Sequence, residues 1–143
     1  MKKTLFFILT LVVAVFVIIS CDGRSTYPLA QSRDSIDKIE LVDFSIYRYN
    51  TEENFLTEPS LMTIDPSMHD TFLDMFFTVN CREHVFHSQQ MIEGPTIRIT
   101  YMDGAYELIC AGDAYYCDEN KRSQYRPYGF DRENFTNFFE SWR

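Results

Sequence analysis

The chain has 143 residues, with 13 basic and 21 acidic side chains and a formal net charge of −8 at pH 7. The length suits one small domain. The charge argues against nucleic acid as a partner, which requires basic patches, and against lying flat on an anionic leaflet.

The first segment, Lys2–Cys21, joins a pair of lysines to an apolar run. Leu5–Ile19 gives 15 residues that are interrupted only by Thr10. Because a membrane-spanning helix needs about 20 apolar residues, this run favours a signal peptide. An uncleaved N-terminal anchor is the alternative.

The run ends in Ile18-Ile19-Ser20-Cys21, which resembles the lipobox of bacterial lipoproteins. The resemblance implies that residues 1–20 are removed and that Cys21 carries acyl chains such as palmitate. Two or three chains hold a protein firmly, at about 0.8 kcal/mol per buried CH2. The resemblance therefore implies a lipid-anchored protein of the cell membrane, with its domain facing the periplasm or the cell exterior.

Residues 21–34 are polar and lack periodicity, so we expect the lipidated cysteine to continue into a flexible tether. Residues 35–143 are then expected to form a single domain. Ser35–Tyr49 is typical of a strand, with a change of phase that suggests a bulge near Leu41–Val42. Leu61–Ile64 is expected to be a second, short strand.

The first long helix is predicted over Pro66–Val79, with Asp65 as its N-cap and proline at its first position. A further strand is predicted at Arg82–Ser88. The residues expected on the inner face of the helix are Met68, Phe72, Met75, Phe76 and Val79.

A hairpin is predicted where Thr96–Met102 and Ala105–Ala111 flank Asp103-Gly104, a signal for a two-residue type I′ turn. This register places the apolar residues of both strands on one face of the hairpin and Glu107 on the other. The pairs that it predicts are Tyr101 with Tyr106, Ile99 with Leu108, Ile97 with Cys110, and Thr100 with Glu107.

The last two predicted elements are a strand and a helix. Pro127 places the strand at Ser123–Phe130 on a sheet edge. The helix, Arg132–Trp142, begins after Asp131 as N-cap. Its expected inner stripe is Phe135, Phe138, Phe139 and Trp142, with Phe130 and Phe135 as a hydrophobic staple. The pattern predicts an α+β fold, a mostly antiparallel sheet of five to seven short strands with two helices on one face.

The candidate metal ligands are Cys81, His84 and His87, whose donor atoms suit zinc or copper. On a strand, however, Cys81 and His87 share one face while His84 points away. Ordinary polar histidines are therefore favoured, and a metal-handling protein is an alternative function.

The cysteines left after lipidation are Cys81, Cys110 and Cys117, which allow three pairings. A Cys110–Cys117 disulfide would close a short loop and contribute about 2.5 kcal/mol. The alternative is that all three are reduced and buried.

No nucleophile elbow and no phosphate-binding loop occur in the sequence, so we predict no catalytic residue and no cofactor. Tyrosines are frequent between residues 101 and 128, and Tyr116 and Tyr125 are expected to be exposed as a binding surface. The sequence thus favours a non-enzymatic binding or accessory module of the cell envelope, with the membrane and an envelope protein as partners. An inhibitor or immunity protein that blocks a basic enzyme is a variant of this hypothesis.

Overall fold

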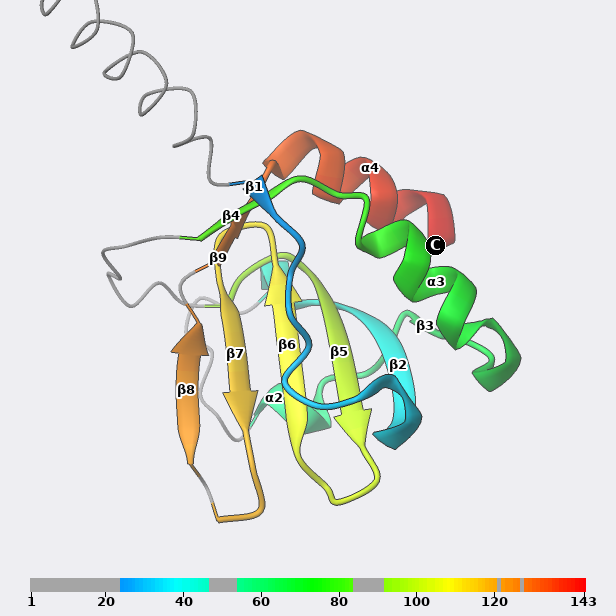
Figure 1. Cartoon of the computed structure of the whole chain (residues 1–143), viewed down its shortest axis with the longest axis vertical. Helices are drawn as coiled ribbons and strands as arrows, with labels where there is room; N and C mark the ends of the chain where they lie inside the picture. The colour runs from blue at the N-terminus through cyan, green and yellow to red at the C-terminus, as the bar shows by residue number, and fades with distance from the viewer. Residues whose placement is uncertain (1–23, 47–53, 84–91, 121, 127) are drawn as a thin grey trace, which may run out of the picture.

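The computed structural model describes residues 24–46, 54–83, 92–120, 122–126 and 128–143. It confirms the α+β prediction, with a six-stranded antiparallel sheet in the order β3-β2-β5-β6-β7-β8 (Figure 1). The strands of this sheet are β2 (Ile36–Asp43), β3 (Met62–Thr63), β5 (Pro95–Tyr101), β6 (Tyr106–Cys110), β7 (Ala114–Cys117) and β8 (Ser123–Arg126). A smaller sheet contains β1 (Arg24–Ser25), β4 (Cys81–Glu83) and β9 (Tyr128–Phe130), in the order β1-β4-β9.

The helices are α2 (Asn54–Thr57), α3 (His69–Phe76) and α4 (Arg132–Trp142). Single 3-10 turns occur as η1 (Arg33–Ser35), η2 (Phe44–Ile46) and η3 (Pro66–Met68). Within the described ranges, no helix combines the length and the apolar character that crossing a membrane requires.

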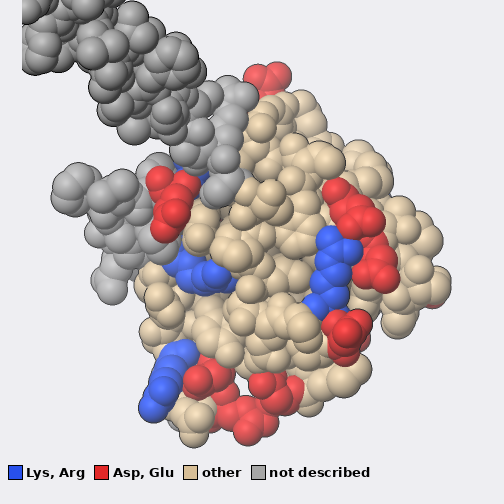
Figure 2. Space-filling model, in the orientation of Figure 1, with Lys and Arg blue, Asp and Glu red and all other residues tan. Residues whose placement is uncertain are grey.

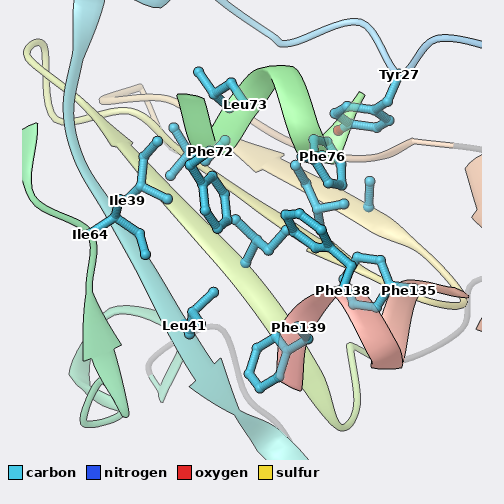
Figure 3. Packing of buried hydrophobic residues seen from close by; sticks show 14 of the residues in the cluster. Tyr27, Ile39, Leu41, Ile64, Phe72, Leu73, Phe76, Phe135, Phe138 and Phe139 are labelled. Atoms are coloured by element: carbon cyan, nitrogen blue, oxygen red, sulfur yellow. The ribbon is translucent and has the colours of Figure 1, made fainter. Parts of the chain in front are cut away.

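Helices α3 and α4 pack on one face of the large sheet, which we call the first face (Figure 3). Both predicted N-caps are confirmed, because the Asp65 side chain accepts from the Ser67 backbone N–H and Asp131 from that of Asn134. The predicted staple is also present, since the rings of Phe130 and Phe135 lie 5.5 Å apart.

The inner face of the first helix differs from the prediction at both methionines. Met68 and Met75 are 40% and 47% exposed, whereas Phe72, Leu73 and Phe76 are buried. The predicted helix is divided into the 3-10 turn η3 and the short helix α3, so only about two turns of α-helix face the sheet. On α4 the predicted stripe is confirmed, with Trp142 half-buried. The three residues of the stripe that are buried are Phe135, Phe138 and Phe139.

The second face of the large sheet is also covered, by a cluster to which α2 and η2 contribute Phe55 and Phe44. Strand β2 therefore carries apolar residues of both parities, with Leu41 on the first face and Val42 on the second. The bulge predicted near Leu41–Val42 is wrong, because the register shift of β2 falls between Ile36 and Lys38.

The β5–β6 hairpin has a register one residue away from the prediction. Its loop contains three residues, with the Tyr101 backbone N–H donating to the Ala105 carbonyl over 2.8 Å. Gly104 supplies the left-handed conformation that this loop needs, with φ +83°. The observed pairs are Thr96 with Cys110, Ile97 with Ile109, Arg98 with Leu108, Ile99 with Glu107, and Thr100 with Tyr106. A shift of one residue reverses the faces of β6, so Glu107 enters the core.

Residues 24–35, which we call the N-terminal strap, belong to the folded domain. The predicted tether over 21–34 is therefore wrong from Arg24 onward, since β1 pairs with β4. Tyr27 is only 2% exposed, and its ring packs edge-on against Tyr128 at 5.2 Å. Figure 1 shows the strap crossing the sheet from β1 to the start of β2. Apolar contacts and hydrogen bonds therefore hold the strap against the domain, where the sequence predicts a flexible tether.

The strand predicted at Ser123–Phe130 is divided between the two sheets. β8 forms an edge of the large sheet, as predicted, and β9 pairs with β4 in the small one. Pro127 lies outside the described residues. The strand predicted at Arg82–Ser88 is described only at its beginning, within β4.

Candidate functional site

A cluster of titratable side chains surrounds Glu107 on the first face. The hydroxyl of Tyr27 donates to Oε2 over 2.7 Å, and that of Tyr101 donates to Oε1 over 2.8 Å. Arg126 Nη1 lies 2.5 Å from Oε2, and the Ala30 backbone N–H donates to Oε1 over 3.3 Å. Four donors thus meet a carboxylate that is fully buried. We call Tyr27, Tyr101, Glu107 and Arg126 the Glu107 cluster.

The electrostatics of this cluster keep both tyrosines protonated. Burial is the main cause that raises the pKa of Tyr27 and Tyr101, and the charge of Glu107 adds to it. For Arg126, burial lowers the pKa, but Tyr27 and Glu107 more than reverse that effect and raise it overall. A carboxylate has about four lone-pair positions, and four donors meet them here. The cluster therefore stabilises the fold, and the Glu107 carboxylate has no acceptor position left for a substrate.

The Glu107 cluster joins three distant segments. Tyr27 lies on the strap, Tyr101 and Glu107 on the β5–β6 hairpin, and Arg126 on the edge strand β8. The Arg126 guanidinium also lies 5.0 Å from the ring centre of Tyr27 and 5.7 Å from that of Tyr128. The cluster therefore connects the N-terminal strap and the sheet edge to the middle of the sheet.

The sequence pattern predicts Glu107 on a polar face and does not indicate its partners. One signal was available, because Glu107 is the sole charged residue in Ala105–Ala111. Tyr27 and Arg126 carry no such local signal, since they are 80 and 19 positions away from Glu107.

A second buried ion pair lies on the opposite face of the sheet. Arg98 Nε donates to Glu40 Oε2 over 2.9 Å, and Lys38 Nζ lies 3.1 Å from Oε1. Arg98 Nη1 also donates to the carbonyls of Phe55 and Glu58. Burial raises the pKa of Glu40, but hydrogen bonds from Arg98 and Lys38 outweigh this and lower it overall. The pair fixes α2 and the residues after it to the sheet.

A hollow of about 500 Å³ lies beside the first turns of α4. Its volume falls within the range of small-molecule sites. The lining combines a cation, Arg132, and an anion, Glu93, with the half-buried apolar residues Pro95 and Ala111, while the adjoining Phe135 is fully buried. The other lining residues are Ser45, Gly94, Cys110, Gly112 and Thr136.

The thiol in the lining of this hollow, Cys110, is not activated. Cys110 Sγ donates to the Asp113 carbonyl over 2.9 Å and accepts from the Asp113 backbone N–H over 3.2 Å. Burial raises its pKa overall, although backbone hydrogen bonds act in the opposite direction. A thiol with a raised pKa is a poor nucleophile. Cys110 is therefore not suited to act as a nucleophile in this hollow.

Only one of the three metal-ligand candidates lies in the described part of the chain. Cys81 is 1% exposed in the core between the sheet and the helices. His84 and His87 lie outside the described residues, as does Cys21. Among the residues that the structure describes, no group of three or more His, Cys, Asp or Glu side chains could hold a metal ion.

No disulfide joins Cys81, Cys110 and Cys117 in the structure. The register accounts for this in the case of Cys110 and Cys117. Cys117 lies opposite Tyr106, four residues along β6 from Cys110. Four residues of strand span about 13 Å, roughly twice the separation that a disulfide tolerates.

Tyr116 and Tyr125 do not form one surface. Tyr115 is the partner of Tyr125 across β7 and β8, so Tyr116 lies on the opposite face of the sheet. Both are half-buried. Tyr116 packs against the first-face core, and Tyr125 packs on Tyr115 with ring centres 5.0 Å apart. The expected aromatic binding surface is therefore absent at these two positions.

Comparison of the chain with models of known protein families, with curated proteins and with solved structures gave no match.

Proposed function

We propose that the protein is a lipid-anchored, non-enzymatic binding module of the bacterial cell envelope. The observation that carries the binding role is the hollow beside α4. Four separate parts of the fold line it, namely η2, the residues around the start of β5, the β6–β7 turn and α4. Walls on folded elements keep a site preformed, which reduces the entropic cost of binding.

The lining of the hollow indicates the kind of ligand that it suits. Arg132 and Glu93 offer opposite charges, and Pro95 and Ala111 offer apolar surface. A small molecule with both a polar and an apolar part satisfies this lining best. The support for the anchor is the lipobox resemblance that ends at Cys21.

The anchor is tested by mass spectrometry of the protein extracted from its native membranes. The expected mass is that of a chain that begins at Cys21 and carries acyl groups. The Cys21→Ala variant should lose these groups and leave the membrane fraction. An intact Met1 together with an unmodified Cys21 would contradict the anchor.

The binding role is tested by native mass spectrometry of the same extracted protein. We expect a non-covalently bound mass that Thr136→Trp, which fills the hollow, removes. Asn137→Trp is the matched control, because its exposed position on α4 lies outside the lining. Thermal denaturation of both variants establishes that they fold. A bound mass that is equal in both variants, or absent from the parent protein, would contradict the proposal.

A further inference from the structure

We infer that one end of the domain lies directly against the phospholipid surface, so that the protein is held close to the membrane. This end, which we call the anchor end, consists of residues 24–25, 80–83 and 128–133. The inference rests on the proposed function, because it takes Cys21 as the point of attachment. The partner of the anchor end is the bilayer surface itself.

Only a short length of chain connects the lipid to the fold. Three peptide steps separate Cys21 from Arg24. Because consecutive Cα atoms are about 3.8 Å apart, the two Cα atoms are separated by at most about 11 Å. Arg24 therefore remains near the membrane whatever path the intervening residues take.

Arg24 already belongs to the small sheet. It lies opposite Arg82 on β4, and Arg82 lies opposite Gly129 on β9. Neighbouring strands are about 4.8 Å apart, so Gly129 stands roughly 10 Å from Arg24. Asn80 accepts a backbone hydrogen bond from Asp131, which joins the start of α4 to the same end.

The strap is held against the domain and therefore does not extend as a spacer. Tyr27 is held by Glu107 and by the rings around it. Further along, Gln31 Nε2 donates to Asp103 over 2.9 Å, at the tip of the β5–β6 hairpin. The strap is thus fastened at both ends of the sheet, and only the residues before Arg24 remain to connect the domain to the lipid.

The charge distribution favours the same orientation. The charged residues of the anchor end are Arg24, Arg82 and Arg132 against Glu83, Asp131 and Glu133, so this end is balanced, whereas the chain as a whole carries −8. Figure 2 shows acidic side chains grouped at the opposite end, where the β5–β6 and β7–β8 turns lie. An anionic leaflet repels such an excess. The balanced end is therefore the one that approaches it most easily.

The experiment places a fluorophore at either end of the membrane-extracted, full-length mature protein. Glu83 and Met102 are both exposed and stand at opposite ends, and each is replaced in turn by p-azidophenylalanine, to which a dye is coupled. The vesicles contain phosphatidylcholine and phosphatidylglycerol with nitroxide on a fraction of the headgroups. Because β6 and its turns separate the two ends by about 20 Å, we expect roughly threefold stronger quenching at position 83 than at position 102.

A variant with 20 Gly/Ser residues inserted between Gly23 and Arg24 is the matched control. Such a linker spans about 25 Å on average and should bring the quenching ratio close to one. Equal quenching at both positions in the parent chain would overturn the inference.

Failure of the proposed function is recognised separately. A mass spectrum without lipid at Cys21 contradicts both the lipid anchor and the orientation that depends on it. Lipid at Cys21 together with a ratio of one refutes the orientation alone.

Discussion

The hydroxyl of Tyr27 donates a 2.7 Å hydrogen bond to Glu107, a carboxylate 80 positions further along the chain with no exposed surface. The bond joins the first described residues to the middle of the sheet. Together with the pairing of β1 and β4, it makes the N-terminal strap part of the domain.

Replacing Tyr27 by Phe should lower the free energy of unfolding by about 1–3 kcal/mol, because a buried carboxylate loses one of its four donors. Urea denaturation followed by the fluorescence of Trp142 measures the loss. Tyr128→Phe is the matched control, since that ring packs on Tyr27 and Tyr128 is not one of the four donors to Glu107. The control should change stability by less than about 0.5 kcal/mol. Equal losses in the two variants would show that the hydrogen bond contributes nothing specific.

The same cluster predicts loss of stability in alkali. Burial and the charge of Glu107 raise the pKa of Tyr27 and Tyr101 in the folded chain, whereas an unfolded tyrosine titrates near about pH 10. Above that pH the unfolded chain releases protons that the folded chain keeps. The free energy of unfolding therefore falls as pH rises, by up to about 1.4 kcal/mol per pH unit for each tyrosine.

The double variant Tyr27→Phe/Tyr101→Phe tests this linkage. It begins less stable, but its free energy of unfolding should fall less steeply between about pH 10 and about pH 12. Urea denaturation at a series of pH values measures the slope. A slope equal to that of the parent protein would mean that these two tyrosines titrate alike in the folded and unfolded chains.

The parts of the fold that could be predicted are those with local signals. Asp65 and Asp131 are N-caps beside the helices that they begin, and the spacing of aromatic residues after Asp131 identifies the buried side of α4. Such signals require only a few neighbouring residues. The α+β class followed from these elements and from the short apolar strands.

The parts that could not be predicted depend on contacts between distant segments. Asp103-Gly104 fits both a two-residue and a three-residue loop, and burial of the flanking strands on both faces leaves little alternation to choose between them. The strap looks like a polar linker because its contacts with the core come from few residues, with Tyr27 buried and Leu29 partly buried. The hollow is equally invisible in the sequence, since its walls come from separate parts of the chain.

On the second face, Arg98→Met should destabilise the protein by about 3–5 kcal/mol, because Glu40 would remain buried without its main partner. The carbonyls of Phe55 and Glu58 would also lose their donor. Lys38→Ala is the matched control, since Lys38 pairs with the same carboxylate but is 44% exposed. The control should lose less than about 1 kcal/mol. Urea denaturation measures both variants, and losses of similar size would contradict the assignment of Arg98 as the principal partner.

The three-residue loop of the β5–β6 hairpin depends on the left-handed conformation of Gly104. Gly104 has φ +83°, so Gly104→Ala should lower the free energy of unfolding by about 1–2 kcal/mol through backbone strain. The added Cβ would make only ordinary contact with Glu119, at 3.5 Å, so no steric clash contributes. Gly112→Ala is the matched control, since Gly112 is exposed in the β6–β7 turn and is not among the described glycines with positive φ. It should change stability by less than about 0.5 kcal/mol in the same urea denaturation measurement. A Gly104→Ala protein as stable as the Gly112→Ala protein would contradict the three-residue loop, and with it the register that places Glu107 in the core.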